Sequence, residues 1–127
     1  MRKILVVEND RISRDLASAV LTRGGYDVVT ASDGEEALQV APELAADLVL
    51  MDVGLPGIDG IEVVETLQHD RRTAETPVVV WSALTMPQDV ERAWSAGCAA
   101  YIAKPVSARE LLQSIDAVFG VTREQAG

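Results

Sequence analysis

Residues 48–60 read LVLMDVGLPGIDG, and this stretch decides the fold. Four apolar residues lead into Asp52, and Gly and Pro then crowd the next eight positions. A short, continuously apolar run that ends in turn-forming residues is typical of a strand buried on both faces of a parallel sheet. The stretch therefore predicts a buried strand that carries one carboxylate to its end and then turns into a loop.

Four other β-rich runs alternate with helical patterns, which predicts a parallel sheet covered by helices on both faces. The five runs are KILVV from residue 3, YDVVTA from residue 26, DLVLM from residue 47, PVVVWS from residue 77 and AAYIA from residue 99. The second run includes Asp27 and Thr30, and this favours a place at the edge of the sheet.

The segments between these runs carry helix signals. In the first segment, one apolar helix face is predicted from Ile12, Leu16, Ala19 and Val20. SDGE at residues 32–35 and SARE at residues 107–110 both fit the capping box of a helix start. We expect the third helix near residues 59–68, the fourth near 88–96 and an amphipathic closing helix after the second box.

Length and composition predict one compact domain. The chain has 127 residues, of which 48% are apolar and 24% charged, and this excludes a disordered or fibrous chain. The net charge is −9 with scattered basic residues, so direct binding to nucleic acid or to an anionic membrane is not expected. The single Cys98 and the lack of a signal peptide or membrane span suit the cytoplasm. We expect a domain over residues 1–120 and a short tail at 121–127.

The candidate site lies at the strand ends, because open parallel sheets bind ligands outside the carboxyl ends of their strands. The residues at these ends are Glu8, Asn9, Asp10, Asp52, Ser82 and Lys104. Crowded carboxylates recruit a hard divalent cation, most plausibly Mg²⁺. With this cation and Lys104 to neutralise charge, and Ser82 to hydrogen-bond a phosphoryl oxygen, Asp52 is predicted to attack phosphorus and form an aspartyl phosphate.

In these motifs the chain resembles the receiver domains of two-component response regulators, of the single-domain chemotaxis or cell-cycle type, over about residues 2–120. The matching pieces are VVEND, LMDVGLPGIDG with its Asp52, Pro56 and Gly60 spacing, VVVWSA and YIAKP. The resemblance implies a flavodoxin-like (βα)5 α/β fold, a doubly wound parallel sheet with strand order 2-1-3-4-5. It also implies a cis peptide bond between Lys104 and Pro105.

The resemblance assigns roles to three of the candidate residues and adds Tyr101. Asp52 is the expected phosphoacceptor, Lys104 the phosphate partner and Ser82 the switch hydroxyl. Tyr101 matches the switch aromatic, which is expected to move inward when Ser82 turns toward the phosphoryl group. The phosphoryl group is expected to come from a sensor histidine kinase or a histidine phosphotransfer protein. The domain is expected to be a signalling module that hydrolyses its own phosphoryl group slowly, and not an enzyme.

The expected metal site departs from the family pattern at one residue. The family usually has two acids after the first strand, of which the second binds the metal directly, and Asn9 stands at that second position. Glu8 is the expected indirect metal partner, and Asp52 and the carbonyl of Gly54 are further ligands. An amide oxygen can coordinate but lacks a carboxylate's charge, so we predict weakened Mg²⁺ binding. Asp10 is expected to cap the first helix instead.

A pseudo-receiver is the alternative: the same fold acting as a phosphorylation-independent protein-interaction module, because Asn9 weakens the metal site. Intact Asp52, Ser82 and Lys104 argue against it. Haloacid-dehalogenase-type phosphatases also phosphorylate an aspartate after a strand, but they need a second aspartate two residues on, where Gly54 stands. The sequence does not support that enzyme class.

Phosphorylation is expected to move the face made by the fourth helix, the fifth strand and the fifth helix. A downstream protein is expected to bind there, on a surface near Val90, Trp94, Tyr101 and Leu111. Trp81 and Trp94 are also predicted to be packing residues. His69, at the end of the third helix, is predicted to be exposed.

Overall fold

A computed structural model of the chain describes residues 1–54, 57, 59–84 and 86–123. Strands and helices alternate through these residues: β1 Lys3–Val7, α1 Arg11–Arg23, β2 Asp27–Ala31, α2 Gly34–Leu44, β3 Leu48–Met51, α3 Gly60–His69, β4 Val78–Ser82, α4 Pro87–Ser95, β5 Ala100–Ala103 and α5 Ala108–Phe119. The strands pair in parallel in the order β2-β1-β3-β4-β5. The predicted doubly wound α/β fold and its strand order are confirmed.

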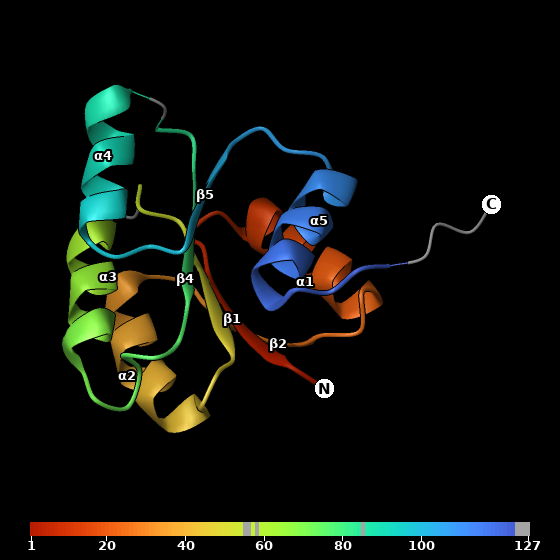
Figure 1. The fold of residues 1–127 in the computed structure, drawn as a ribbon, viewed down its shortest axis with the longest axis horizontal. Coiled ribbons are helices and arrows are strands. Elements are labelled where there is room, and N and C mark those ends of the chain that lie inside the picture. Colours follow the sequence, from red (N-terminus) through yellow and green to blue (C-terminus); the bar gives the residue numbers. More distant parts are fainter. Residues whose placement is uncertain (55–56, 58, 85, 124–127) are drawn as a thin grey trace.

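Helices cover both faces of the sheet, with α1 and α5 on one side and α2, α3 and α4 on the other (Figure 1). Successive side chains of a strand point to opposite faces, so the apolar strands feed both layers. In β1, Leu5 and Val7 pack in the layer of α2, α3 and α4, and Ile4 and Val6 in the layer of α1 and α5. The double burial explains why this strand is apolar throughout. The second strand lies at the edge, as its polar residues predict.

The predicted apolar face of α1 is confirmed at Val20, which packs against the core, and wrong at Ile12, Leu16 and Ala19, which are exposed. Ala17 and Leu21 are the buried residues of this helix. By contrast, Ile12 is 79% exposed and Leu16 is 52% exposed. Successive residues of a helix are about 100° apart around its axis. Because Ala17 and not Leu16 faces the sheet, the buried face of α1 is rotated by about that angle from the predicted one. The prediction gave weight to large side chains, whereas the small Ala17 lies against the sheet.

Helix caps follow the sequence with one correction. Asp10 caps α1 and Ser107 caps α5, as predicted, and the amide of Glu110 donates to Ser107 Oγ at 3.1 Å. The box predicted at residues 32–35 is wrong by one residue, because α2 begins at Gly34 with Asp33 as its cap. The amide of Glu36 donates to Asp33 Oδ1 at 2.8 Å, and the Glu36 carboxylate accepts from the amide of Ser32 at 3.2 Å and from its hydroxyl at 2.9 Å.

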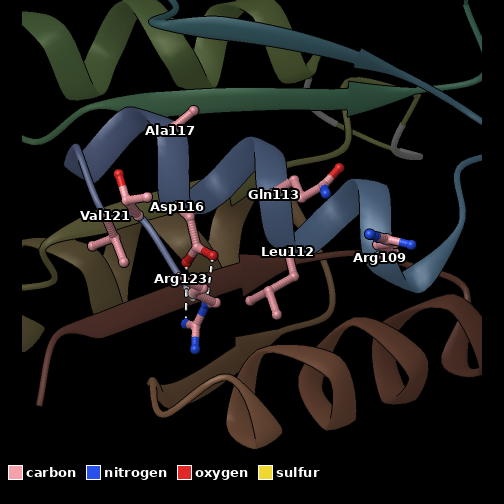
Figure 2. A pocket seen from close by; sticks show the side chains of 8 residues that line it. Arg109, Leu112, Gln113, Asp116, Ala117, Val121 and Arg123 are labelled. Carbon is pink, nitrogen blue, oxygen red and sulfur yellow. Dashed lines mark hydrogen bonds and ion pairs between the residues drawn. The ribbon is translucent and has the colours of Figure 1, made fainter. Parts of the chain in front are cut away.

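The chain folds back on itself after α5, which ends at Gly120 with a φ of 69°. Arg123 Nε donates to Asp116 Oδ2 at 2.6 Å, and its Nη2 donates to the Gly24 carbonyl, also at 2.6 Å. Tyr26 Oη donates to Asp116 Oδ1 at 2.5 Å, and Asp116 is only 5% exposed. Figure 2 shows Arg123 reaching Asp116 beside a pocket of about 340 Å³. Residues 121–123, which were expected in the tail, thus connect α5 to the turn between α1 and β2.

In the part of the chain that the structure describes, no helix has the length and apolar character needed to span a bilayer. Cys98 is buried. His69 is exposed, as predicted. Trp81 is 4% exposed and packs in the core, but Trp94 is 50% exposed, so the packing role predicted for Trp94 is wrong.

Candidate functional site

Polar side chains from four segments meet at the carboxyl edge of the sheet. Glu8 follows β1, Asp52 follows β3, Ser82 ends β4 and Lys104 follows β5. Backbone hydrogen bonds continue the strand ladders past three of these ends: Glu8 N to Ala31 O at 3.0 Å, Asp52 N to Val7 O at 3.0 Å and Lys104 N to Ser82 O at 2.8 Å. The sheet therefore fixes the backbone that carries each charged side chain.

One ammonium group serves two carboxylates at the centre of this edge. Lys104 Nζ lies 3.1 Å from Asp52 Oδ2 and also pairs with Glu8 Oε1. Glu8 is 1% exposed and Asp52 is 9% exposed, so both acids are largely removed from water. Charges in such an environment need a partner, and Lys104 supplies it. The peptide bond between Lys104 and Pro105 is cis, as predicted.

Burial and pairing set the protonation of this cluster in opposite directions. Burial raises the pKa of the Glu8 carboxyl, and the bonds from Lys104 and from the amide of Asp10 offset only part of the rise. Burial by itself would lower the pKa of Lys104, but its bonds to Glu8 and Asp52 outweigh burial and raise that pKa. Lys104 therefore stays charged, whereas ionised Glu8 is less favourable here than in water.

The loop after β3 begins with Asp52, and its backbone turns back toward the Asp52 carboxylate. The amide of Gly54 donates to Asp52 Oδ1 at 2.8 Å, so each carboxylate oxygen of Asp52 has one donor. At the start of α3, a Cβ on Gly60 would lie 2.3 Å from Val53 Cα, which explains the glycine at that position. Pro56, which belongs to the predicted spacing, lies outside the described residues.

The loop after β1 uses Asp10 to start α1. Asp10 Oδ2 accepts from the amide of Ser13 at 3.0 Å and from its hydroxyl at 2.8 Å. The carboxylate of Asp10 thus has the capping role predicted for it, and Asn9 is exposed beside it. Arg14 Nη1 donates to the carbonyl of Glu8 at 3.0 Å and to that of Asn9 at 3.4 Å. Arg14 was not predicted at this site; its position four residues after the helix cap is the signal that places it over this loop.

Ser82 and Tyr101 converge on one residue of the loop after β4. The buried Ser82 Oγ accepts from the amide of Leu84 at 3.0 Å. The hydroxyl of Tyr101, on β5, donates to the carbonyl of the same residue. The backbone of Leu84 is therefore held by side chains of two strands, Ser82 of β4 and Tyr101 of β5.

Comparison with known proteins agrees with this arrangement. The sequence model of the response regulator receiver domain family matches residues 4–116. The chain belongs to this family. Polar-differentiation response regulator DivK of Brucella ovis is 34% identical over 119 residues, which cover 94% of this chain and 97% of DivK. The structure of the chemotaxis response regulator CheY4 of Vibrio cholerae matches with a TM-score of 0.88 and 30% identity, covering 93% of this chain and 98% of CheY4.

A further receiver domain bears on the metal. The receiver domain of a Pseudomonas aeruginosa sensor histidine kinase, solved with a magnesium ion coordinated in its active-site cleft, matches with a TM-score of 0.86. It is 28% identical, and the match covers 94% of this chain and 98% of that domain. Receiver domains typically bind Mg²⁺ at this edge of the sheet.

The oxygen donors of this receiver domain fit such a cation. Asp52 and Glu8 supply carboxylates, Asn9 an amide oxygen and Gly54 a backbone carbonyl, and hard oxygen atoms are the ligands that Mg²⁺ prefers. Within the described ranges, no group of three or more His, Cys, Asp and Glu side chains is placed to hold a metal ion. The site thus offers the right chemistry with a low carboxylate count.

The surface predicted for a downstream partner needs one correction. Leu111 is 3% exposed and packs in the core beneath α1 and α5, so it is not available to a partner. Its place at the first buried turn of α5 explains why an apolar residue stands there. Val90 and Tyr101 are half-buried, and Trp94 is half-exposed on α4. The loop before α4 adds Leu84, which is 42% exposed.

Proposed function

We propose that this receiver domain accepts a phosphoryl group on Asp52 from a phosphohistidine of a sensor histidine kinase or a histidine phosphotransfer protein. One observation carries the proposal: the ammonium of Lys104 lies 3.1 Å from Asp52 Oδ2 and pairs with the buried Glu8 in the same cluster. An acceptor carboxylate next to a fixed cation is the arrangement that phosphoryl transfer requires, since negative charge gathers there in the transition state.

The transfer is a displacement at phosphorus. A carboxylate oxygen of Asp52 forms the new P–O bond while the P–N bond to the donor imidazole breaks, and the imidazole leaves with the bonding electron pair and takes up a proton. Lys104 balances charge on the phosphoryl oxygens. Ser82 Oγ, which now accepts from Leu84, turns its hydroxyl toward one of those oxygens. Later attack of water on phosphorus returns free Asp52 and phosphate slowly.

Four residues would hold Mg²⁺ at this site. They are Asp52, Asn9 and the carbonyl of Gly54, with Glu8 acting indirectly. When bound, the ion supplies positive charge to the phosphoryl oxygens. Asn9 contributes a neutral oxygen where a second acid is usual, so we expect Mg²⁺ to bind weakly.

The conformational effect of phosphorylation would reach the surface through the loop after β4, whose backbone bonds to Ser82 and Tyr101. When Ser82 turns to the phosphoryl group, the amide of Leu84 loses its acceptor, and the Tyr101 side chain is free to move inward. The loop leads directly into α4, so a downstream protein would sense the change on the face of α4, β5 and α5, near Val90, Trp94 and Tyr101.

The same proposal places the domain in the cytoplasm, where histidine kinases present their donor domains. Its one cysteine is buried and has no second cysteine with which to form an internal disulfide. The net charge of −9 argues against direct contact with nucleic acid or anionic lipid, so the partners are proteins.

Intact mass after incubation with acetyl phosphate tests the proposal. The wild type with Mg²⁺ should gain one phosphoryl group, and Asp52→Asn should gain none. Asp15→Asn, a change at an exposed aspartate of α1, is the matched control and should behave as the wild type. A wild-type chain that gains no mass at any Mg²⁺ concentration contradicts phosphorylation.

A pseudo-receiver is the second candidate, and Asn9 is the observation that favours it. If the wild type gains no phosphoryl group but Asn9→Asp does, the metal site alone prevents the reaction, and the domain acts through protein contacts without phosphorylation. If neither protein reacts, the cause lies beyond this residue.

A further inference from the structure

Lys104 has a third neighbour besides its two carboxylates. Its Nζ lies 4.3 Å from the centroid of the Trp81 ring. Trp81 stands on β4 directly before Ser82, but its side chain points to the opposite face of the sheet, where it packs with Val79 and Ile102. The ring is 4% exposed, so the core holds it in place.

The contact has the geometry of a cation–π interaction. An ammonium within about 6 Å of an indole centroid is attracted to the negative face of the ring, and the attraction grows when water is excluded. The side chain of Lys104 is 19% exposed, so little water competes. Glu8 and Asp52 take up hydrogen-bonding directions of the ammonium, and the ring covers a further side of it.

Without the Trp81 ring, the Lys104 side chain would be free to move into a neighbouring pocket. A pocket of about 340 Å³ opens next to Lys104 and is lined mainly by carbon, from Leu16, Trp81, Ala83, Pro105 and Val106 together with Ser13. A lysine has a flexible four-carbon stem, and its ammonium reaches many positions unless neighbours restrict it. Lys104 itself lines this pocket beside Trp81, so the pocket is open to the lysine side chain and the ring lies along one side of it.

Trp81 also carries a cost that packing alone does not explain. Its indole N–H is buried and has no hydrogen-bond partner among the described residues. A leucine at the same place would fill core space without an unpaired donor. The aromatic face toward Lys104 is what tryptophan supplies in return.

We infer that Trp81 is a positioning residue that holds the ammonium of Lys104 against the phosphoacceptor Asp52. Trp81 does not touch the reacting atoms. It acts through Lys104, and it keeps the cation in place while the charge on Asp52 is exchanged for that of the phosphoryl group. The inference rests on the proposed phosphorylation of Asp52.

The rate of phosphorylation by acetyl phosphate tests the inference, since this small donor needs no protein docking surface. Trp81→Leu should lower the rate about tenfold, as expected for loss of a desolvated cation–π contact, and Trp81→Phe, which keeps a ring, should recover most of it. The control is Phe119→Leu. Phe119 has its own cation–π contact, 4.6 Å from Arg2 Cζ, at the other end of the strands, and its loss should leave the rate unchanged.

A fluorescence measurement tests the contact without any phosphorylation. The chain has two tryptophans, so in a Trp94→Phe background Trp81 is the sole tryptophan, and excitation at the red edge of indole absorption selects it over tyrosine. Lys104→Met should then shift the emission of Trp81, because a cation leaves the ring face, whereas Lys3→Met should not. This arm uses an intact Trp81 and does not depend on whether Trp81→Leu folds.

The outcomes separate the inference from the proposed function. No adduct on the wild type contradicts phosphorylation, and the fluorescence arm still decides whether Lys104 sits on the ring. A wild-type rate in folded Trp81→Leu overturns the positioning role. An unchanged emission spectrum in Lys104→Met overturns the contact itself.

Discussion

Asn9 sets the charge of the proposed metal site. The carboxylates beside it, Glu8 and Asp52, already share the ammonium of Lys104, so the cluster has two negative charges and one positive charge when fully ionised. A second acid in place of Asn9 would restore the usual two-acid pattern after β1. The exposed position of Asn9 means that the exchange needs no repacking of the core.

Asn9→Asp should therefore tighten Mg²⁺ binding by about tenfold, or ~1.4 kcal/mol, because a charged oxygen replaces a neutral one. Isothermal titration calorimetry with MgCl₂ measures the affinity directly. Asn9→Ser, which keeps a neutral oxygen, is the matched control and should bind no more tightly than the wild type. Equal affinities for Asn9→Asp and the wild type would mean that residue 9 is not a ligand.

Glu8 shows the cost of building this site. Burial raises its pKa above the ordinary value of 4.5, so ionised Glu8 is less favourable in the folded chain than in the unfolded one. Well below pH 4.5 both states hold the proton and Glu8 does not lower the stability of the folded chain. As the pH rises from 4.5 through the raised folded-state pKa, the unfolded state ionises first and stability falls.

Glu8→Gln should consequently be more stable than the wild type at pH 7, and this advantage should shrink toward pH 4. Urea denaturation at the two pH values gives the free energies of unfolding. The variant should also bind Mg²⁺ less well, as expected when a functional site carries a stability cost. A variant less stable than the wild type at pH 7 would show that Glu8 supports the fold through its pairing with Lys104.

At the scale of elements, residues 120–123 form a strap, a short segment that holds the end of α5 to the turn between α1 and β2. Burial alone would raise the pKa of Asp116, but the bonds from Arg123 and Tyr26 outweigh burial and lower it. A carboxyl with a lowered pKa stabilises the fold above its ordinary pKa of 3.8, and this stabilisation disappears as the pH falls through the folded-state value. The strap thus joins α5 to the α1–β2 turn through a charge pair, at the end of the sheet remote from the site.

Arg123→Met should lower the free energy of unfolding at pH 7, because it leaves a buried carboxylate with fewer donors; the partial exposure of Arg123 limits the loss. Urea denaturation measures the difference in the free energy of unfolding between the variant and the wild type, and this difference should become smaller below pH 3.8. Arg109→Met, at an exposed arginine lining the same pocket, should change stability by less than about 0.5 kcal/mol. Equal stability of Arg123→Met and the wild type would mean that the strap is not needed.

For the molecule as a whole, the apolar pattern predicted a parallel sheet with β2 at an edge, whereas the full strand order, with β5 at the other edge, was predicted from the resemblance to receiver domains. Strands that are apolar on both faces favour the interior of a sheet, where helices cover both faces, and β1, β3 and β4 lie there. The strand with polar residues, β2, lies at an edge of the sheet. The same logic brought Glu8, Asp52 and Lys104 together, because the carboxyl ends of parallel strands share one edge.

Side-chain direction set the limit of prediction. The choice between Leu16 and Ala17 as the inward residue of α1 depends on how closely that helix approaches the sheet, which periodicity alone does not encode. The ring of Trp81 reaches Lys104 from the opposite face of β4, and Arg123 reaches Asp116 by a reversal of the chain. Contacts of this kind depend on three-dimensional packing between segments far apart in the sequence.

The whole-molecule prediction concerns how phosphorylation of Asp52 reaches α4. In the present structure the amide of Leu84 donates to Ser82 Oγ, and phosphorylation should remove this acceptor. Amide hydrogen exchange in a peptide containing Leu84 should then become about fivefold faster, as expected for the loss of ~1 kcal/mol of hydrogen bonding. Ser82→Ala should show the faster exchange without any phosphodonor, and Asp52→Asn should show the slow exchange with it. Faster exchange confined to peptides around Asp52 would mean that the signal leaves by another face, because the loop into α4 would then be insensitive to the phosphoryl group.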